Sequence, residues 1–370
     1  GPVIANVKGE ELERPERIHN AQNKYMPRLI AWEVTRTCNL SCVHCRASSE
    51  VGPYSGELST EEGIRFLSDI ASFSQPIIIM TGGEPLLRAD IFDLASHGSS
   101  LGLKMVMSSN GTMLTEEWVG KIDDAGVKRL SISLDGASSE IHDKFRMVEG
   151  AFEGAVRGIE LIKKSGLEFQ VNTTITQYNL SELPAIQELA CRLGAAAHHI
   201  FLLVPTGRGK DLTDQEISPS DYEKTLHWFY DQREKVSLHL KATCAPHYYR
   251  ILRQRARAEG KTVTLDNFGM DAVTKGCLGG QSFAFISHRG EVRICGYMEV
   301  KCGDIRQESF RHIWHHSPVF LAMRDVDGYG GRCGRCEYRR VCGGCRARAY
   351  AVSGDYLAEE PFCSYVPAGM

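Results

Sequence analysis

The sequence predicts an α/β fold, in which a parallel β-sheet covered by helices is followed by a cysteine-rich unit. Between residues 29 and 235, short apolar runs alternate with amphipathic stretches, and this alternation of strand and helix is typical of a parallel sheet. From residue 271 onward the alternation stops, and glycine and cysteine become frequent. A region of this kind has little apolar core of its own, which indicates that bound metal holds it together.

Six strand-helix units are expected in the first region. The expected strands are residues 29–34, 76–80, 103–108, 129–134, 168–175 and 197–204, and the helices that follow them are 59–73, 89–100, 115–126, 152–166, 181–194 and 219–235. Ser59 and Glu62 form a capping-box pattern at one helix start. Three glycines stand where helices should end: Gly126, Gly166 and Gly194. Periodicity alone leaves open a partial barrel or an open doubly wound sheet, and in both the chemistry belongs at the C-terminal strand ends.

The chain divides into four segments. We expect an N-terminal arm at 1–28, the sheet-and-helix unit at 29–235, a polar, arginine-rich connector at 236–270 and the cysteine-rich unit at 271–370. A chain of 370 residues is long enough for a catalytic core and a smaller second unit.

Composition narrows the function classes. With 42% hydrophobic residues, 24% charged residues and a net charge of −3, the chain is typical of an ordinary globular protein without a nucleic-acid partner. We expect a cytoplasmic protein, because no apolar run reaches the ~18 residues of a membrane span and the polar start lacks the apolar core of a signal peptide. Under reducing conditions the 13 cysteines indicate metal ligands or catalytic groups rather than disulfides.

Three cysteines lie close together directly after the first expected strand. Cys38, Cys42 and Cys45 form a CxxxCxxC motif, and three thiolates on one tight loop suit an iron-sulfur cluster or zinc. Structural zinc requires four ligands, and the nearest candidate, His44, stands on a loop too short to wrap all four around one ion. A four-iron cluster on three cysteines keeps one iron open for a ligand from outside the protein.

This motif resembles that of the radical S-adenosylmethionine (SAM) enzymes, where it follows the first strand of a partial (β/α)6 TIM-like barrel. The resemblance implies that the three cysteines hold a [4Fe-4S] cluster that binds SAM, and no further catalytic residue is assigned. His44 occupies a position where many members carry an aromatic residue near the adenine. The resemblance also implies SAM contacts at successive strand ends, namely Gly82, Gly83, Glu84, Ser108, Asn110, Ser133, Asp135, Arg146, Asn172 and Val204.

Two of these contacts have a specific expected chemistry. Glu84, in the turn TGGEP, would accept a hydrogen bond from the SAM amino group, and the glycines before it would let the backbone approach the ligand. Arg146 would pair with the SAM carboxylate. Each feature alone is common in turns and on surfaces. The expected SAM site therefore depends on finding all of them together, in family order, after the cysteine motif.

The C-terminal cysteines resemble the SPASM or twitch-like extension that carries one or two auxiliary iron-sulfur clusters. The resemblance implies one cluster on Cys277, Cys295 and Cys345, and another on Cys333, Cys336, Cys342 and Cys363. The first set lacks a fourth ligand, so either Cys302 completes it or one iron stays open. The alternative is a zinc-ribbon-like module on Cys333, Cys336, Cys342 and Cys345.

Longer stretches, among them FLLVPTGRGK and LKATCAPHYYRI, resemble the haem b synthases of the siroheme-dependent haem pathway, which are Fe-coproporphyrin III decarboxylases. The resemblance implies an iron-tetrapyrrole substrate, two of whose propionates are oxidatively decarboxylated to vinyl groups with one SAM consumed for each. It also implies an electron donor such as a ferredoxin or flavodoxin.

Residues in these stretches suit an anionic, iron-bearing macrocycle. Arg208, Lys210 and Arg250 would pair with propionates. Either Cys244 or His247 would ligate the substrate iron, or Tyr248 and its neighbour Tyr249 would stack on the ring. The plain alternative for Cys244 and His247 is a packed connector.

Other functions share these motifs. Two sister tetrapyrrole enzymes, the didecarboxysiroheme deacetylase and the haem d1 propionate-processing enzyme, would carry most of the same sequence motifs. Peptide-modifying SPASM maturases usually carry a leader-binding domain of ~80 residues, whereas 28 residues precede the first expected strand here. A non-catalytic zinc scaffold is the alternative from a different class.

Overall fold

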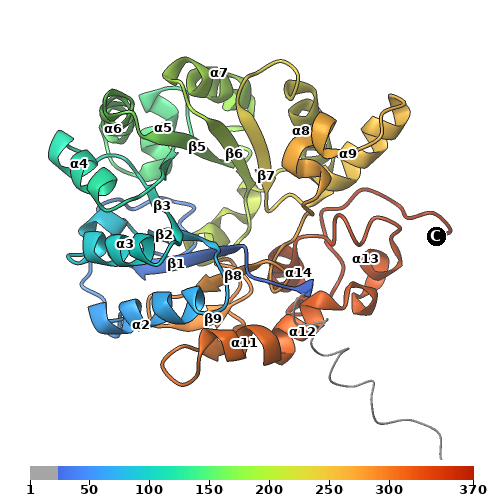
Figure 1. The fold of residues 1–370 in the computed structure, drawn as a ribbon. Helices are drawn as coiled ribbons and strands as arrows, with labels where there is room; N and C mark the ends of the chain where they lie inside the picture. Colours follow the sequence, from blue (N-terminus) through green and yellow to red (C-terminus); the bar gives the residue numbers. More distant parts are fainter. Residues whose placement is uncertain (1–23) are drawn as a thin grey trace, which may run out of the picture.

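The computed structural model describes residues 24–370 (Figure 1), so the expected N-terminal arm lies almost wholly outside the described residues. Seven parallel strands follow one another in chain order: β1 (Leu29–Thr35), β2 (Ile77–Gly82), β3 (Lys104–Ser109), β4 (Arg129–Ser133), β5 (Glu168–Ile175), β6 (Ala197–Leu202) and β7 (His239–Thr243). A doubly wound sheet reverses its strand order at a switch point. The order here does not reverse, so the sheet is the partial barrel and not the doubly wound alternative.

The main helices lie around the outside of this curved sheet (Figure 1). They are α2 (Thr60–Ala71), α3 (Ile91–Ser100), α4 (Glu116–Asp124), α6 (Ala151–Ser165), α7 (Leu183–Leu193) and α8 (Pro219–Gln232). Parallel strands joined by right-handed crossovers place successive helices on one face when the strand order does not reverse. The capping box of Ser59 and Glu62 is present, and the three expected glycines take left-handed backbone angles at helix ends. Helix α5 (Ser139–Arg146) was not expected.

The core lies between the sheet and these helices. On β1, Ile30, Trp32 and Val34 are fully buried. Trp32 meets Phe66 of α2 edge to face, with ring centroids 5.5 Å apart. Strands of parallel sheets are buried on both faces and therefore form nearly continuous apolar runs, which is why the sequence located them well.

The sheet extends beyond the six expected strands. β7 and the following α9 (His247–Ala258) come from the segment expected to be a connector. On the other side, β8 (Phe283–Ile286) pairs in parallel with β1, and β9 (Glu291–Arg293) and β10 (Lys301–Asp304) continue antiparallel. The cysteine-rich segment therefore supplies three strands of the ten-stranded sheet and covers the edge that β1 would otherwise expose.

The remaining elements are short. They are α10 (Leu265–Phe268), α11 (Phe310–His316), α12 (Pro318–Arg324), α13 (Gly331–Arg335), α14 (Arg346–Ser353) and 3-10 helices at Pro85–Leu87, Leu180–Glu182, Gly207–Gln215, Gly269–Ala272 and Val326–Gly328. Along residues 24–370, every helix is too short or too polar to cross a membrane.

A buried carboxylate joins the two halves of the chain. Glu33 of β1 is fully buried. It lies 2.8 Å from Arg46 Nη1 in the cysteine loop and 2.8 Å from His288 Nδ1 in the turn between β8 and β9. Burial by itself raises the pKa of Glu33, but the hydrogen bond to His288 and the charges of Arg46 and Arg36 outweigh it and hold the pKa well below its usual range.

We predict that Glu33→Gln lowers the free energy of unfolding by about 3 kcal/mol, because it removes the carboxylate that pairs with Arg46 in a largely buried site. The pKa of Glu33 is lowered on folding, so the carboxylate stabilises the fold above its unfolded pKa of about 4.3. That contribution disappears as the pH falls toward the folded pKa. Urea denaturation followed by tryptophan fluorescence measures both effects.

Glu117→Gln is the matched control for this prediction. Glu117 also pairs with a cation, Lys121 at 2.7 Å, but its side chain is 71% exposed, so we expect a change below about 0.5 kcal/mol. Equal effects of the two substitutions would contradict a structural role for the buried carboxylate.

Candidate active site and cluster sites

The cysteine motif occupies the loop after β1, where each thiol accepts an N–H. Leu40 N donates to Cys38 Sγ at 3.5 Å, Ser49 N to Cys45 Sγ at 3.4 Å, and Arg146 Nη1 to Cys42 Sγ at 3.4 Å. Hydrogen bonds to sulfur stabilise thiolate charge in iron-sulfur sites. The donor set of this loop therefore fits a cluster.

Across residues 24–370, no three Cys, His, Asp or Glu side chains come close enough together to hold a single metal ion. A four-iron cluster is larger than one ion and takes its thiolates at separate corners. All 13 cysteines are free thiols, so they are available for such clusters.

The TGGEP turn holds the cysteine loop in place from one side. Gly83 N donates to Thr35 O at 2.9 Å, and Glu84 N donates to Thr37 O at 2.8 Å. A Cβ on Gly83 would lie 2.2 Å from Thr37 O, and one on Gly82 would lie 2.0 Å from Thr35 O. The glycines thus let the turn approach the backbone that leads into Cys38, where we had expected them to approach a ligand.

The Glu84 carboxylate is already occupied by protein donors. It is fully buried and accepts from Ser109 Oγ at 3.0 Å, Asn110 N at 2.9 Å and Leu86 N at 3.2 Å. Burial raises the pKa of Glu84 to about 7, even though these hydrogen bonds lower it. In this geometry Glu84 fixes the turn to the end of β3, and its contact with the SAM amino group stays a prediction.

Arg146 is likewise held by the protein, through Asp135 at the end of β4. The two side chains form a buried ion pair, and Asp135 Oδ1 also accepts from Thr174 N at 2.8 Å. Burial raises the pKa of Asp135, but Arg146 and His44 lower it further than burial raises it. Within residues 24–370, Arg146 Nε is buried without a hydrogen-bond partner, which leaves one donor beside Cys42 for a ligand.

The other expected SAM contacts lie along the same edge of the sheet. Ser133 and Asn172 are directly opposite each other on β4 and β5. Asn110 Nδ2 donates to Asn39 Oδ1 in the cysteine loop at 2.8 Å. Ser108, on β3, pairs with Ser131 of β4, and Val204 is buried after β6. Of these residues, Asn110 contacts the cysteine loop directly, and the SAM contacts of the others stay predictions.

A second contact closes on the cysteine loop from the end of β6. A Cβ on Gly207 would lie 2.3 Å from Arg46 O. Arg208 donates from Nε to Cys42 O at 2.9 Å and from Nη1 to Ser49 O at 2.8 Å. Arg208 thus supports the loop rather than reaching outward for a propionate as we had expected, whereas Lys210 is exposed.

Two residues of the CAPHYYR stretch face the protein interior. Tyr248 is fully buried and packs against Phe229 of α8, with ring centroids 5.8 Å apart. Arg250 is buried and lies 2.6 Å from Glu223. α9 thus packs both side chains against α8, and Arg250 also lines a cavity with Cys333 and Cys336. The expected substrate contacts of Tyr248 and Arg250 stay predictions.

One cavity collects the second expected set of auxiliary ligands. Its lining includes Cys333, Cys336, Cys342 and Cys363. His247 also lines this cavity; it is buried, and among the described residues neither of its ring nitrogens has a hydrogen-bond partner. His247, expected as a ligand of the substrate iron, instead faces a site with four cysteines.

The first auxiliary set is also drawn together, but without Cys302. Cys277 N donates to Cys342 O at 3.2 Å, and an added Cβ on Gly279 would lie 2.2 Å from Ile294 Cγ2, next to Cys295. Burial raises the pKa of the Cys295 thiol, and the charges of Cys277 and Cys345 raise it further. Cys302 lies on β10 and donates to Val300 O at 3.8 Å. The structure does not bring the tentative fourth ligand to the other three.

Sequence reasoning missed a buried ion pair beside these cysteines. Arg348 and Glu360 are fully buried and lie 3.3 Å apart. Arg348 Nη2 donates to Leu203 O and to Cys244 O, each at 3.1 Å, so it ties α14 to the ends of two strands. In the sequence Arg348 follows CGGCRA, and no pattern there marks it as a buried residue. Arg46 was also missed, because the only sequence feature that distinguishes it from an ordinary exposed arginine is that it follows Cys45 directly.

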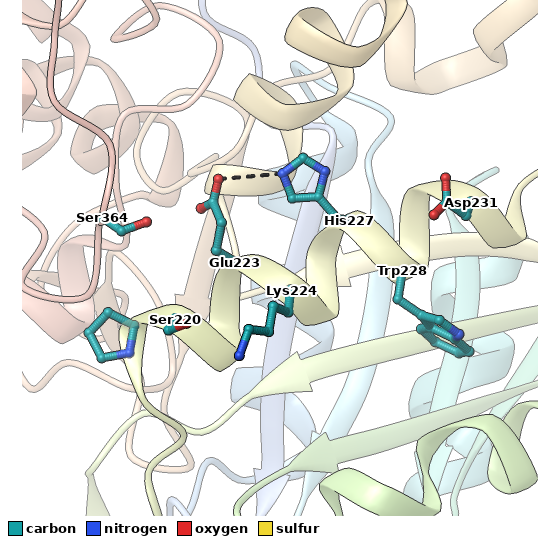
Figure 2. A pocket seen from close by; sticks show the side chains of 8 residues that line it. Ser220, Glu223, Lys224, His227, Trp228, Asp231 and Ser364 are labelled. Atoms are coloured by element: carbon teal, nitrogen blue, oxygen red, sulfur yellow. Dashed lines mark ion pairs between the residues drawn. The ribbon is translucent and has the colours of Figure 1, made fainter.

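A surface hollow along α8 is separate from these sites. Figure 2 shows its lining, which consists of one face of α8 together with Ser364. Glu223 takes part in an ion pair with His227 at 3.7 Å there. The expected SAM and cluster residues do not line it, so we assign no chemistry to this hollow.

Comparison with known proteins agrees with this geometry. The Radical SAM superfamily model matches residues 32–190, and the SPASM model, an iron-sulfur cluster-binding domain, matches 277–346. The "AdoMet-dependent heme synthase" of Oleidesulfovibrio alaskensis is 56% identical over 92% of this chain and 88% of its own, and that of Methanosarcina barkeri is 52% identical over 92% and 97%. The "Fe-coproporphyrin III synthase" of M. barkeri is 30% identical over 90% and 87%.

Solved structures share the fold. SuiB of Streptococcus suis bound to S-adenosylmethionine has a TM-score of 0.74 at 14% identity and covers 98% of this chain and 84% of its own. The chain therefore combines a radical SAM domain, whose cofactors are SAM and a [4Fe-4S] cluster, with a SPASM domain for auxiliary iron-sulfur clusters. From its identity with full-length relatives, it belongs to the AdoMet-dependent haem synthase family of radical SAM enzymes.

Proposed function

We propose that the protein is a haem b synthase, which oxidatively decarboxylates two propionate side chains of Fe-coproporphyrin III to vinyl groups. The observation that carries the proposal is identity of 52–56% to haem synthases over more than nine-tenths of this chain. The "Pre-heme d1 synthase" of Dinoroseobacter shibae and the M. barkeri "Fe-coproporphyrin III synthase" are each 30% identical. The larger identity favours haem b formation over the sister reactions.

The residues around the loop have clear proposed tasks. Cys38, Cys42 and Cys45 would hold the SAM-binding cluster, and the free Arg146 Nε would donate to a SAM carboxylate beside it. When bound, the cluster and SAM supply a 5′-deoxyadenosyl radical, which removes hydrogen from an unactivated carbon. The backbone contacts of Gly83 and Gly207 hold the loop rigid, and such rigidity keeps reacting groups in productive geometry.

The proposed reaction balances for each propionate. One hydrogen atom leaves the carbon next to the ring, the carboxylate leaves as carbon dioxide, and one electron leaves the substrate as the vinyl double bond forms. We propose that an auxiliary cluster receives this electron, and that a ferredoxin or flavodoxin supplies the reducing electron for SAM cleavage. Of the cationic residues expected at the barrel mouth, exposed Lys210 is left to meet a propionate.

Turnover of defined substrates tests the proposed function. Anaerobic protein incubated with Fe-coproporphyrin III, SAM and a reductant should give haem b, with two molecules of 5′-deoxyadenosine for each haem formed. Mass spectrometry and chromatography of both products measure this ratio. Formation of 5′-deoxyadenosine with a sirohaem derivative or a peptide, and not with Fe-coproporphyrin III, would overturn the assignment.

Cysteine substitutions separate the two kinds of cluster. We expect Cys42→Ala to lower SAM cleavage by more than about 100-fold, because loss of a metal ligand exceeds the 10- to 100-fold effect of an outer residue. Cys336→Ala should keep at least part of the SAM cleavage while losing vinyl product, since its proposed cluster takes the electron from the substrate. Quantifying both products in each variant tests this difference.

Cys191→Ala is the control for these substitutions. Cys191 lies on α7, within the barrel, and we assign it no ligand role, so its removal should leave both products within about twofold of the wild type. Equal loss of both products in Cys42→Ala and Cys336→Ala would contradict separate cluster roles.

A further inference from the structure

The first auxiliary set of Cys277, Cys295 and Cys345 lacks a fourth protein ligand if only the C-terminal cysteines are considered. Backbone contacts place two of these cysteines close together. Cys277 N donates to Cys342 O at 3.2 Å, three residues before Cys345. A Cβ on Gly279 would lie 2.2 Å from Ile294 Cγ2, so the segment after Cys277 also presses on the residue before Cys295.

Cys244 follows β7, and contacts on either side of it in the sequence hold it near Cys345 and Cys277. Its carbonyl accepts from Arg348 Nη2 at 3.1 Å, and Arg348 lies one helical turn after Cys345. Two residues after Cys244, Pro246 meets Gly276, where an added Cβ would lie 2.3 Å from Pro246 Cβ. The backbone around Cys244 is thus held against the chain segments that carry Cys345 and Cys277.

The groups that act on the Cys244 thiol agree with these backbone contacts. Burial raises the pKa of Cys244 well above its usual range. The charges of Cys345 and Cys295 raise it further, Arg348 lowers it, and the charge of Cys277 raises it again. Four thiols from four separate parts of the chain therefore converge.

The backbone of Cys244 is held in an uncommon conformation. Its φ of 55° lies in the left-handed region, which residues with a Cβ usually avoid and keep only where their surroundings impose it. Hydrogen bonds to its carbonyl from Tyr222 Oη at 2.8 Å and from Arg348 impose it here. This conformation fixes the backbone from which the thiol projects.

Cys302 has different surroundings. Beyond burial, the groups that shift its pKa are Ser317, the Ile294 backbone and Arg293. The neighbouring Gly303 faces α11, since an added Cβ would lie 2.7 Å from Ile313 Cγ1. Cys302 is therefore a half-buried residue of the sheet edge, and free cysteine commonly behaves as a small apolar side chain.

We propose that Cys244 is the fourth ligand of the first auxiliary iron-sulfur cluster, together with Cys277, Cys295 and Cys345. The inference rests on the proposed assignment of a cluster to those three cysteines, and it does not depend on the identity of the substrate. It replaces both earlier expectations, that Cys302 completes this set and that Cys244 ligates the substrate iron. A cluster with four thiolates is closed, so it would exchange electrons with the substrate without binding it.

Metal analysis without substrate or SAM tests the proposal. The full chain carrying Cys244→Ala or Cys302→Ala is reconstituted anaerobically, and iron, acid-labile sulfide and the electron paramagnetic resonance spectrum after reduction are measured. Each substitution is made in a triple variant, Cys38→Ala/Cys42→Ala/Cys45→Ala, which serves as the common background. The triple variant lacks the signal of the SAM-binding cluster. We expect Cys244→Ala either to lose up to about four irons per chain or to change the spectrum, and Cys302→Ala to match the background.

Unchanged iron and an unchanged spectrum in Cys244→Ala, or loss in Cys302→Ala alone, would overturn the proposal. If Cys244→Ala does not fold, as circular dichroism would show, Cys244→Ser decides: a changed spectrum supports ligation and an unchanged one overturns it. Retained iron and spectrum in Cys244→Ala, combined with weaker absorbance changes on adding Fe-coproporphyrin III, would make Cys244 a substrate ligand instead. Failure of wild-type turnover leaves these readouts intact, so the two proposals fail separately.

Discussion

The buried carboxylate of Glu33 is matched from three directions by Arg46, Arg36 and His288. Removing a carboxylate from water is costly unless it is paired and hydrogen-bonded. The burial of Glu33 in β1 therefore destabilises the fold unless these partners are in place. Arg46 belongs to the cysteine loop and His288 to the C-terminal half. One desolvated charge therefore couples the position of the SAM-cluster loop to the docking of the cysteine-rich unit on the sheet.

Other contacts complete the support of that loop. The TGGEP turn presses on it from β2, and Gly207 and Arg208 press on it from β6. A cluster site needs ligands fixed before the metal arrives, and rigid backbone contacts supply this more reliably than side chains free to rotate. Residues expected to touch SAM, such as Glu84, have thus become part of the support.

The strands and the cysteine loop were predictable because buried apolar runs and close ligand spacing are local properties of the chain. β7 was missed since HLKAT is short and partly exposed, and the pairing of β8 with β1 joins residues more than 250 positions apart. Side-chain contacts were less predictable than strands for a common reason: a motif cannot reveal which protein groups already pair with a polar side chain. Asp135 pairs with Arg146 in this way and leaves only its Nε free, and Glu223 pairs with Arg250.

Arg348 indicates why the fourth auxiliary ligand comes from the barrel and not from the SPASM segment. Its guanidinium is neutralised by Glu360 in a site closed to water, and its remaining donors hold the carbonyls at the ends of β6 and β7. Docking α14 on the barrel therefore requires the β7 end to lie against Cys345, and the residue at that end is Cys244. A ligand set shared between barrel and extension makes cluster assembly and domain docking one event, because binding the metal stabilises only the docked arrangement.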